Sequence, residues 1–121
     1  MNNLYRETKY LNPIEVAQTM SHTLKIEEKC DLVVCLSHIG YSYGDDQRPS
    51  DLKLAAKTEY IDLIIGGHTH TFLDKPTIAV NRKGQNMLVN QVGCYGINLG
   101  RIDFYFDVQN SSSAEGVSIV V

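Results

Sequence analysis

The sequence lacks several features that would assign the protein to a class at once. None of its apolar runs approaches the roughly 20 residues that span a bilayer, and residues 1–9 are polar, without the apolar core of a signal peptide. Its three cysteines do not have metal-ligand spacing, and their odd number gives no disulfide framework. The 11 lysines and arginines form no basic stripe, and the formal net charge is −3. We therefore expect no membrane span and no nucleic-acid partner.

What is present is typical of a globular chain. The 121 residues correspond to one domain or a piece of one, with 43% hydrophobic and 21% charged residues. A chain of this size can bury a real core. No internal repeat is visible, and the only low-complexity tract is a short run of serines.

A helix is predicted near the amino terminus. Asn12 can serve as its N-cap, Pro13 suits the first helical position, and Glu15 stands where it completes a capping box. We expect the helix to run to about Lys29, because apolar residues then recur at helical spacing: Val16, Ala17, Met20 and Leu24.

A strand, a helix and a second strand follow. Residues 32–36 and 61–65 are rich in aliphatic side chains and read as strands buried on both faces, as in a parallel sheet covered by helices. Ser50 can cap a helix that ends near Thr58. This order predicts a right-handed βαβ unit with parallel strands.

The rest of the chain predicts mostly antiparallel strands. Arg82-Lys83-Gly84 gives a hairpin signal, and apolar side chains alternate with polar ones after Leu99. The expected strands are 77–80, 86–92, 99–107 and 117–121, and the serine-rich residues 110–116 are expected to form a turn. The fold class is therefore α/β, a βαβ unit followed by mostly antiparallel strands.

Three of the four histidines lie where the two predicted parallel strands end. His38 follows the first strand, and the segment Gly66-Gly67-His68-Thr69-His70 follows the second. Neighbouring strands are about 4.8 Å apart, so side chains beyond their carboxyl ends can converge. In an extended segment His68 and His70 would point the same way and could chelate one ion or serve two. Imidazole suits zinc, iron and manganese, so we predict a metal site.

Other residues are weaker candidates. His22 lies on the predicted first helix, away from its apolar stripe, and is expected to be exposed. Aspartates in loops usually form turns, although they could supply oxygen ligands: Asp45, Asp46 and Asp51. Asn90 lies near the end of a predicted strand and Tyr95 follows it; both could line a substrate pocket, or could simply belong to a strand end and its turn.

Together these segments resemble a known family. Ser37-His38-Ile39-Gly40, the helix with Asp51, the segment 61–70 and the segment 89–101 are similar to the second half of a calcineurin-like metallophosphoesterase domain, in its 5′-nucleotidase and UDP-sugar hydrolase branch. The resemblance covers residues 12–107. It implies a partial metallophosphoesterase sandwich, with residues 1–121 as the carboxy-terminal half of the catalytic domain.

The resemblance also implies two divalent metal ions in the parent protein, of undetermined identity (Zn, Mn, Fe, Mg or Co). His38 and His68 would bind one ion and His70 the other. The family uses such a pair of ions to activate a hydroxide that hydrolyses a phosphoester, here expected to belong to a 5′-nucleotide or a related nucleotide.

The other metal-binding motifs of the family are not found in this sequence. The residues before His38 contain neither the Asp-x-His nor the Asn-His motif of the family. We therefore expect this chain alone to be inactive, to bind at most a partial set of metal ions, and to contain no catalytic residue beyond these ligands.

Three further expectations concern self-association, cellular location and an alternative function. A half sheet exposes an apolar face and an edge strand, so self-association through that edge is expected. The resemblance suggests a periplasmic or exported parent. An alternative function, a non-catalytic metal-binding or interaction module, fits the same three histidines.

Overall fold

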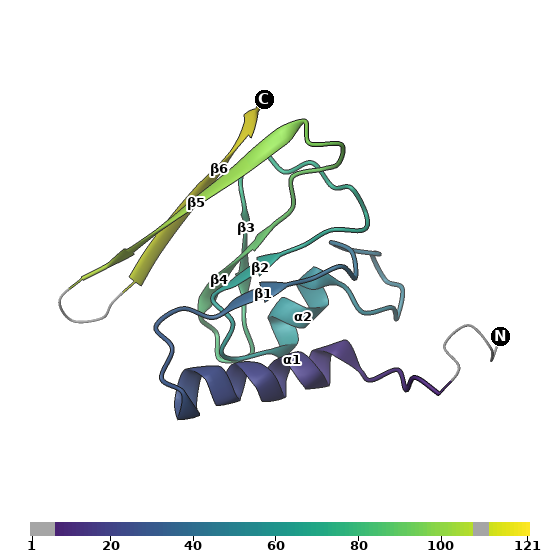
Figure 1. Cartoon of the computed structure of the whole chain (residues 1–121), viewed down its shortest axis with the longest axis vertical. Coiled ribbons are helices and arrows are strands. Elements are labelled where there is room, and N and C mark those ends of the chain that lie inside the picture. The colour runs from purple at the N-terminus through teal and green to yellow at the C-terminus, as the bar shows by residue number, and fades with distance from the viewer. Residues whose placement is uncertain (1–6, 108–111) are drawn as a thin grey trace.

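The computed structural model describes residues 7–107 and 112–121. Figure 1 shows two helical segments on one side of a small sheet and a long two-stranded ribbon on the other. The elements are α1 (Pro13–His22), the π-helical turn η1 (Thr23–Glu27), β1 (Val34–Leu36), α2 (Asp51–Lys57), β2 (Leu63–Ile65), β3 (Thr77–Val80), β4 (Asn86–Asn90), β5 (Asn98–Phe106) and β6 (Ser112–Val120). No helix in the described ranges is long and apolar enough to cross a bilayer.

The first helix begins as predicted and ends differently. The Asn12 side chain accepts a hydrogen bond from the backbone N–H of Ile14, and Pro13 occupies the first turn. The α-helix ends at His22 and changes into a π-helical turn that ends at Glu27. Lys29 then has a φ of 56°, a left-handed conformation that cannot continue the helix.

The four-stranded sheet has the order β1-β2-β4-β3. β1, β2 and β4 are parallel to one another, and β3 runs antiparallel to β4. The predicted parallel pairing of the βαβ unit is confirmed, with α2 connecting the neighbouring strands β1 and β2. The β3–β4 hairpin also lies where the sequence predicts it.

β5 and β6 form a separate antiparallel ribbon. β6 is longer than predicted, since it begins at Ser112 inside the segment expected to be a turn. Asn110 and Ser111 of that segment lie outside the described residues. Gly100 and Gly116 bring the ribbon close to the sheet, because a Cβ at Gly100 would lie 2.8 Å from Val92 and one at Gly116 would lie 2.6 Å from Pro76.

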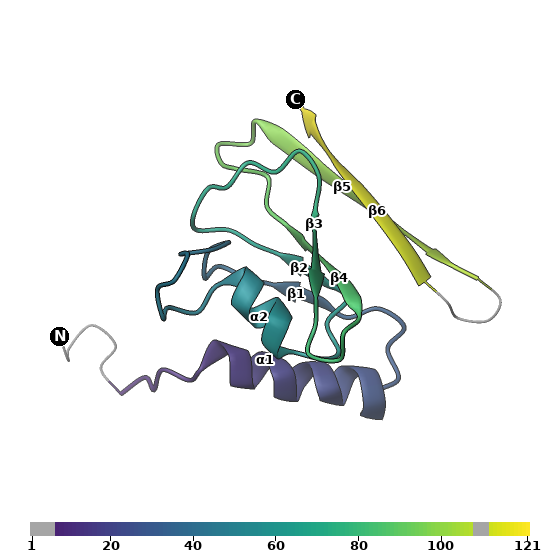
Figure 2. The same ribbon diagram turned by 180° about the vertical axis from the view of Figure 1, so that it is seen from behind.

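The helices lie along one face of the sheet, as Figure 2 shows from behind. The core lies between them. Alternate strand residues such as Ile64 and Val89 point into it and are completely buried, and α2 adds Leu54 and Ala55. Ile14 and Ala17 of α1 pack against the same cluster. The apolar side chains that alternate along the strands and those that recur at helical spacing in α1 thus pack into one core.

The prediction that both strands of the βαβ unit are buried on both faces is wrong for β1. Val34 is 40% exposed and Leu36 is 80% exposed. Their face of the sheet is covered by the β5–β6 ribbon only near β3 and β4, where Leu88 and Phe104 line one small cavity. β1 is also an edge strand, since its only neighbour among the described strands is β2.

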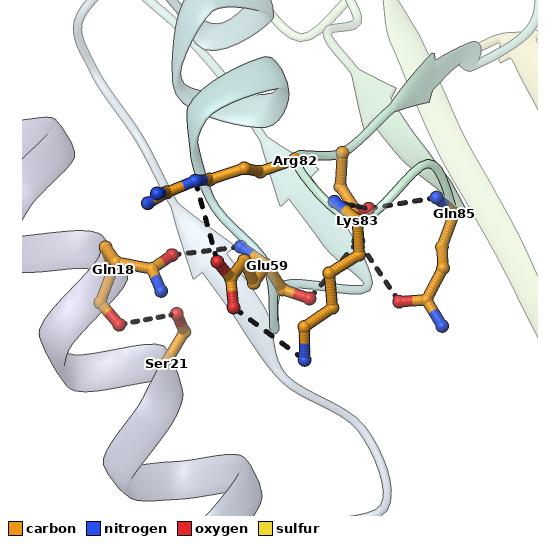
Figure 3. A network of polar contacts seen from close by, with 7 residues as sticks. Gln18, Ser21, Glu59, Arg82, Lys83 and Gln85 are labelled. Carbon is orange, nitrogen blue, oxygen red and sulfur yellow. Dashed lines mark hydrogen bonds and ion pairs between the residues drawn. The ribbon is translucent and has the colours of Figure 1, made fainter.

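A polar network joins the helical layer to the β3–β4 turn, at the end of the sheet away from the histidines (Figure 3). Glu59 forms ion pairs with Arg82 and Lys83 at 3.6 and 3.7 Å. The backbone N–H of Glu59 donates to the Gln18 side chain of α1 at 2.9 Å. The network fixes α1 against the segment that follows α2.

Candidate metal-binding half-site

Three strand ends meet at one edge of the sheet and bring the predicted residues there. The backbone N–H of Ser37 donates to Ile65, and that of Gly66 donates to Asn90, each at 2.8 Å. These bonds continue the parallel pairing one residue beyond the strands. The segments after β1, β2 and β4 therefore lie side by side, as the sequence predicts for the first two.

His38 and His68 converge. Their ring centroids are 5.4 Å apart, with the ring planes inclined at 70°, and both side chains are exposed. Gly67 makes this approach possible, because a Cβ there would lie 2.9 Å from Nδ1 of His38. The two imidazoles lie side by side with access to solvent.

The backbone around His68 is not extended, contrary to the prediction. The N–H of Thr69 donates to the carbonyl of Gly67 at 2.9 Å, and His68 between them has a φ of 73°. A three-residue turn with a positive central φ is the rarer and more strained of the two γ-turn forms. His70 also has a positive φ, 51°. Non-glycine residues in this conformation cluster at functional sites.

His70 lies apart from the other two rings. Its ring lies beside that of Tyr95, with centroids 6.2 Å apart. Tyr95 is 89% exposed and has a φ of 63°. Within the described ranges, no group of three His, Cys, Asp or Glu side chains is placed to hold a metal ion. The predicted ligands thus divide into a pair, His38 with His68, and a separate His70.

The aspartate candidates have different surroundings. Asp45 and Asp46 lie in an exposed loop, where Asp46 pairs with Arg48 at 3.0 Å. Asp51, the first residue of α2, is completely buried. Its Oδ1 accepts a hydrogen bond of 2.5 Å from the Ser37 hydroxyl, beside His38. Asp51 therefore anchors Ser37, the residue before His38, by this hydrogen bond, and its own carboxyl is not open to solvent.

Burial is the largest influence on the pKa of Asp51. Desolvation raises the pKa of its carboxyl above the usual value, and the Ser37 hydroxyl and nearby His38 oppose that rise. Burial, with a smaller contribution from the charge of Asp51, also raises the pKa of the Cys35 thiol in β1. Cys35 packs against the core as a small hydrophobic residue.

Of the two weak substrate-binding candidates, only one faces solvent. Asn90 is 5% exposed, and its Oδ1 has no hydrogen-bond partner within the part of the chain that the structure describes. Tyr95 is exposed beside His70. His22, as predicted, is exposed and lies away from the site, against Tyr60.

Sequence reasoning overlooked one polar side chain beneath the histidines. Gln91 follows β4 directly and is 2% exposed. It hydrogen-bonds to Gly67, Thr69 and Thr71, on either side of His68 and His70. The only sequence signal was a glutamine at the end of an apolar strand, next to the histidine-bearing one.

Known proteins place this arrangement in a family. No protein-family model matches the chain. The chain is 42% identical over 93 residues to the trifunctional nucleotide phosphoesterase protein YfkN of Bacillus subtilis strain 168, a match that covers 77% of the chain and 6% of that protein. It is 33% identical over 118 residues to an apyrase of Tabanus yao, covering 85% of the chain and 20% of the apyrase.

A solved structure agrees with these relatives. The 5′-nucleotidase precursor of Thermus thermophilus superimposes with a TM-score of 0.76 at 30% identity, over 91% of this chain and 23% of that one. The chain therefore spans less than a quarter of the length of each of these three proteins. In sequence and in fold together, the chain is therefore similar to one part of nucleotide phosphoesterases, apyrases and 5′-nucleotidases.

Proposed function

We propose that this chain supplies His38, His68 and His70 to a two-metal site that hydrolyses phosphoesters of nucleotides in the parent protein. The observation that carries the proposal is the convergence of two exposed imidazoles, 5.4 Å apart, at the ends of neighbouring parallel strands. The phosphoesterase and nucleotidase names of the relatives support a nucleotide substrate. An exported parent, which the resemblance suggests, is part of the same proposal.

The residues present fit part of a metal site. Neutral imidazoles are ligands for zinc, iron and manganese, and His38 and His68 offer two to one ion. His70 lies two residues further along the same loop and would serve the second ion. Because the described residues hold no cluster of three ligands, the remaining ligands are proposed to come from polypeptide outside this chain. Divalent ions at such a site neutralise phosphoryl oxygens and lower the pKa of water.

An apolar groove beside His38 is the proposed docking place for that polypeptide. The groove has a volume of about 770 Å³ and lies between α1 and β1. Its walls include Leu11, Val16, Met20 and Leu36, all of them exposed. A strand pairing with the free edge of β1 would cover Leu36 and bring its own side chains next to His38. Residues 1–121 would then be the carboxy-terminal half of the catalytic domain.

The test is complementation. Hydrolysis of p-nitrophenyl phosphate and of AMP is measured with Mn²⁺ or Zn²⁺, for this chain alone and after mixing with a separate chain that carries the Asp-x-His and Asn-His motifs. We expect turnover only in the mixture, and its loss in His68→Ala. His22→Ala is the matched control, because His22 is exposed and away from the site.

Two results would contradict the proposal in different ways. Turnover by the isolated chain that disappears in His68→Ala would show that the half-site is complete without a partner. No turnover in a mixture whose two chains demonstrably associate would remove the hydrolytic role.

The same histidines support a second candidate, a non-catalytic metal-binding module. Calorimetry separates the two functions. Zn²⁺ binding at roughly micromolar Kd, lost in His38→Ala and His68→Ala, favours the module if no mixture turns over substrate.

A further inference from the structure

Gln91 contacts the histidine loop at alternate residues. Its Nε2 donates to the carbonyl oxygen of Gly67 at 2.9 Å. Its Oε1 accepts from the backbone N–H of Thr71 at 2.5 Å and from the Thr69 hydroxyl at 3.2 Å. The bonded residues are 67, 69 and 71, and the residues between them are His68 and His70. The Gln91 side chain therefore bonds the loop from its buried side, and both imidazoles remain exposed.

The loop needs such support because its conformation is unfavourable by itself. His68 and His70 both have positive φ values, a backbone conformation that is strained for a non-glycine residue. Such backbone persists only where surrounding contacts fix it. The Thr69 hydroxyl also accepts from the N–H of Tyr41 at 3.0 Å, which joins the segment after His38 to the same network.

Glutamine is the side chain that this position requires. The loop presents one carbonyl that needs a donor and one N–H that needs an acceptor, and a primary amide satisfies both. At 2% exposure, water cannot replace either bond. The backbone of Gln91 is also bonded to the segment that follows the histidines, because its carbonyl accepts from the N–H of Leu73.

We infer that Gln91 is the positioning residue of the half-site: it holds the loop 67–71 in the strained form that presents His68 and His70 to the metal ions. It touches neither metal nor substrate, and acts only through the loop. Its effect on metal affinity rests on the proposed function, whereas its effect on the backbone of the loop does not.

The first measurement uses the metal-free chain. Scalar couplings in NMR spectra report the sign of φ at His68 and His70, and amide exchange reports protection of the Thr71 N–H. In Gln91→Met, a variant of similar volume without donor or strong acceptor, we expect both histidines to lose the positive φ. Exchange at Thr71 should become at least about tenfold faster.

The second measurement is Zn²⁺ binding by calorimetry. Residues that orient metal ligands typically contribute about 10- to 100-fold to affinity, and we expect a loss in that range for Gln91→Met. The matched control is Gln18→Met, which removes another partly buried glutamine bond, to the N–H of Glu59, in the polar network of Figure 3. It should lower Tm and leave the couplings and the Zn²⁺ affinity within about twofold of the wild type.

A milder variant keeps the test open if Gln91→Met does not fold. Gln91→Glu retains the two acceptor bonds and loses the donor to Gly67. We expect Thr71 to stay protected while the coupling at His68 changes. Positive φ values that persist at both histidines in the folded variants overturn the inference. A wild-type chain that binds no Zn²⁺, in which the variants still alter the couplings, contradicts the proposed function and leaves the positioning role of Gln91 intact.

Discussion

At the scale of single residues, Asp51 is the most unusual group in the molecule. Its carboxyl is completely buried, one oxygen accepts from Ser37, and the other has no hydrogen-bond partner within the described ranges. That second oxygen lies directly against Gly66. A carboxyl in this position contacts both the segment after β1 and the segment after β2. Its burial costs more free energy when it is ionised than when it is protonated.

The first prediction follows from the raised pKa of Asp51. Because the native state favours the protonated carboxyl, its contribution to stability is fully present below the unfolded-state pKa of about 3.9 and is lost as the pH rises through the folded-state value. Asp51→Asn is neutral at every pH and does not suffer that loss. Urea unfolding should show the variant gaining stability relative to the wild type between about pH 3.5 and pH 7. Parallel pH profiles would contradict the prediction.

A second prediction concerns the contact between Gly66 and Asp51. A Cβ at Gly66 would overlap Oδ2 of Asp51, which is fixed in the core. Gly66→Ala should therefore lower the free energy of unfolding by about 1–3 kcal/mol or more. In the double variant with Asp51→Ala the loss should be smaller than the sum of the two single losses.

The neighbouring glycine provides the comparison for that experiment. A Cβ at Gly67 would meet the ring of His38, which is exposed and can move aside. Gly67→Ala should therefore cost less stability than Gly66→Ala, as measured by urea unfolding. Equal losses would show that the contact with Asp51 is not what makes Gly66 necessary.

The residues of the site were only partly predictable. His38 and His68 follow neighbouring strands, so their convergence could be predicted from strand spacing alone. The turn at His68 could not, because it depends on Gln91, which lies more than 20 residues away and reaches the loop only after β2 and β4 pair. No local pattern contains such a contact.

At the scale of elements, α2 connects the core to the candidate site, because it buries Leu54 and Ala55 and carries Asp51. This seven-residue helix is too short to be stable alone. It is capped by Ser50, whose hydroxyl accepts from the N–H of Lys53, and it buries Leu54 and Ala55 against the sheet. Tertiary packing, more than helix propensity, thus maintains the element that carries Asp51.

The third prediction tests this packing. Leu54 is 2% exposed, and Leu54→Ala should lower the free energy of unfolding by about 2–5 kcal/mol in urea titrations. Leu99 on β5 is 56% exposed, and Leu99→Ala should change it by no more than about 0.5 kcal/mol. Similar losses for both variants would mean that α2 contributes little to the core.

The elements themselves were largely predictable, and their ends were not. Aliphatic runs and turn residues located β1 to β4 and both helices. The end of α1 was placed too late, because the apolar spacing that continues to Leu24 also fits the π-helical turn. The early start of β6 was not visible, because serines favour turns and are placed in a strand here by pairing with β5.

At the scale of the whole molecule, the part of one sheet face next to β1 is left uncovered by the described residues. The edge of β1 is unpaired within the described residues, and Val34, Leu36 and Ile65 expose apolar surface next to it. Natural sheets usually cover or charge such an edge. This surface is where the proposed complementary chain would bind.

The fourth prediction is that, without that partner, the chain associates with itself through β1. Light scattering at increasing concentration should show a rising mean mass. Leu36→Lys, which places a charge on the edge strand, should return the chain to a monomer. Val120→Lys is the control, because Val120 is also highly exposed, at 77%, but belongs to the β5–β6 ribbon. A wild-type monomer at all concentrations would contradict the prediction.

The parallel pairing of β1 with β2 also sets the order in which the histidines can meet during folding. The β3–β4 hairpin closes through a short turn and can form in microseconds, whereas β1 and β2 are separated by a loop and all of α2. His38 and His68 approach each other only when these distant segments have paired. We therefore expect the two imidazoles to come into contact after the β3–β4 hairpin has formed. Capture of a metal ion during refolding would then report when the parallel sheet closes.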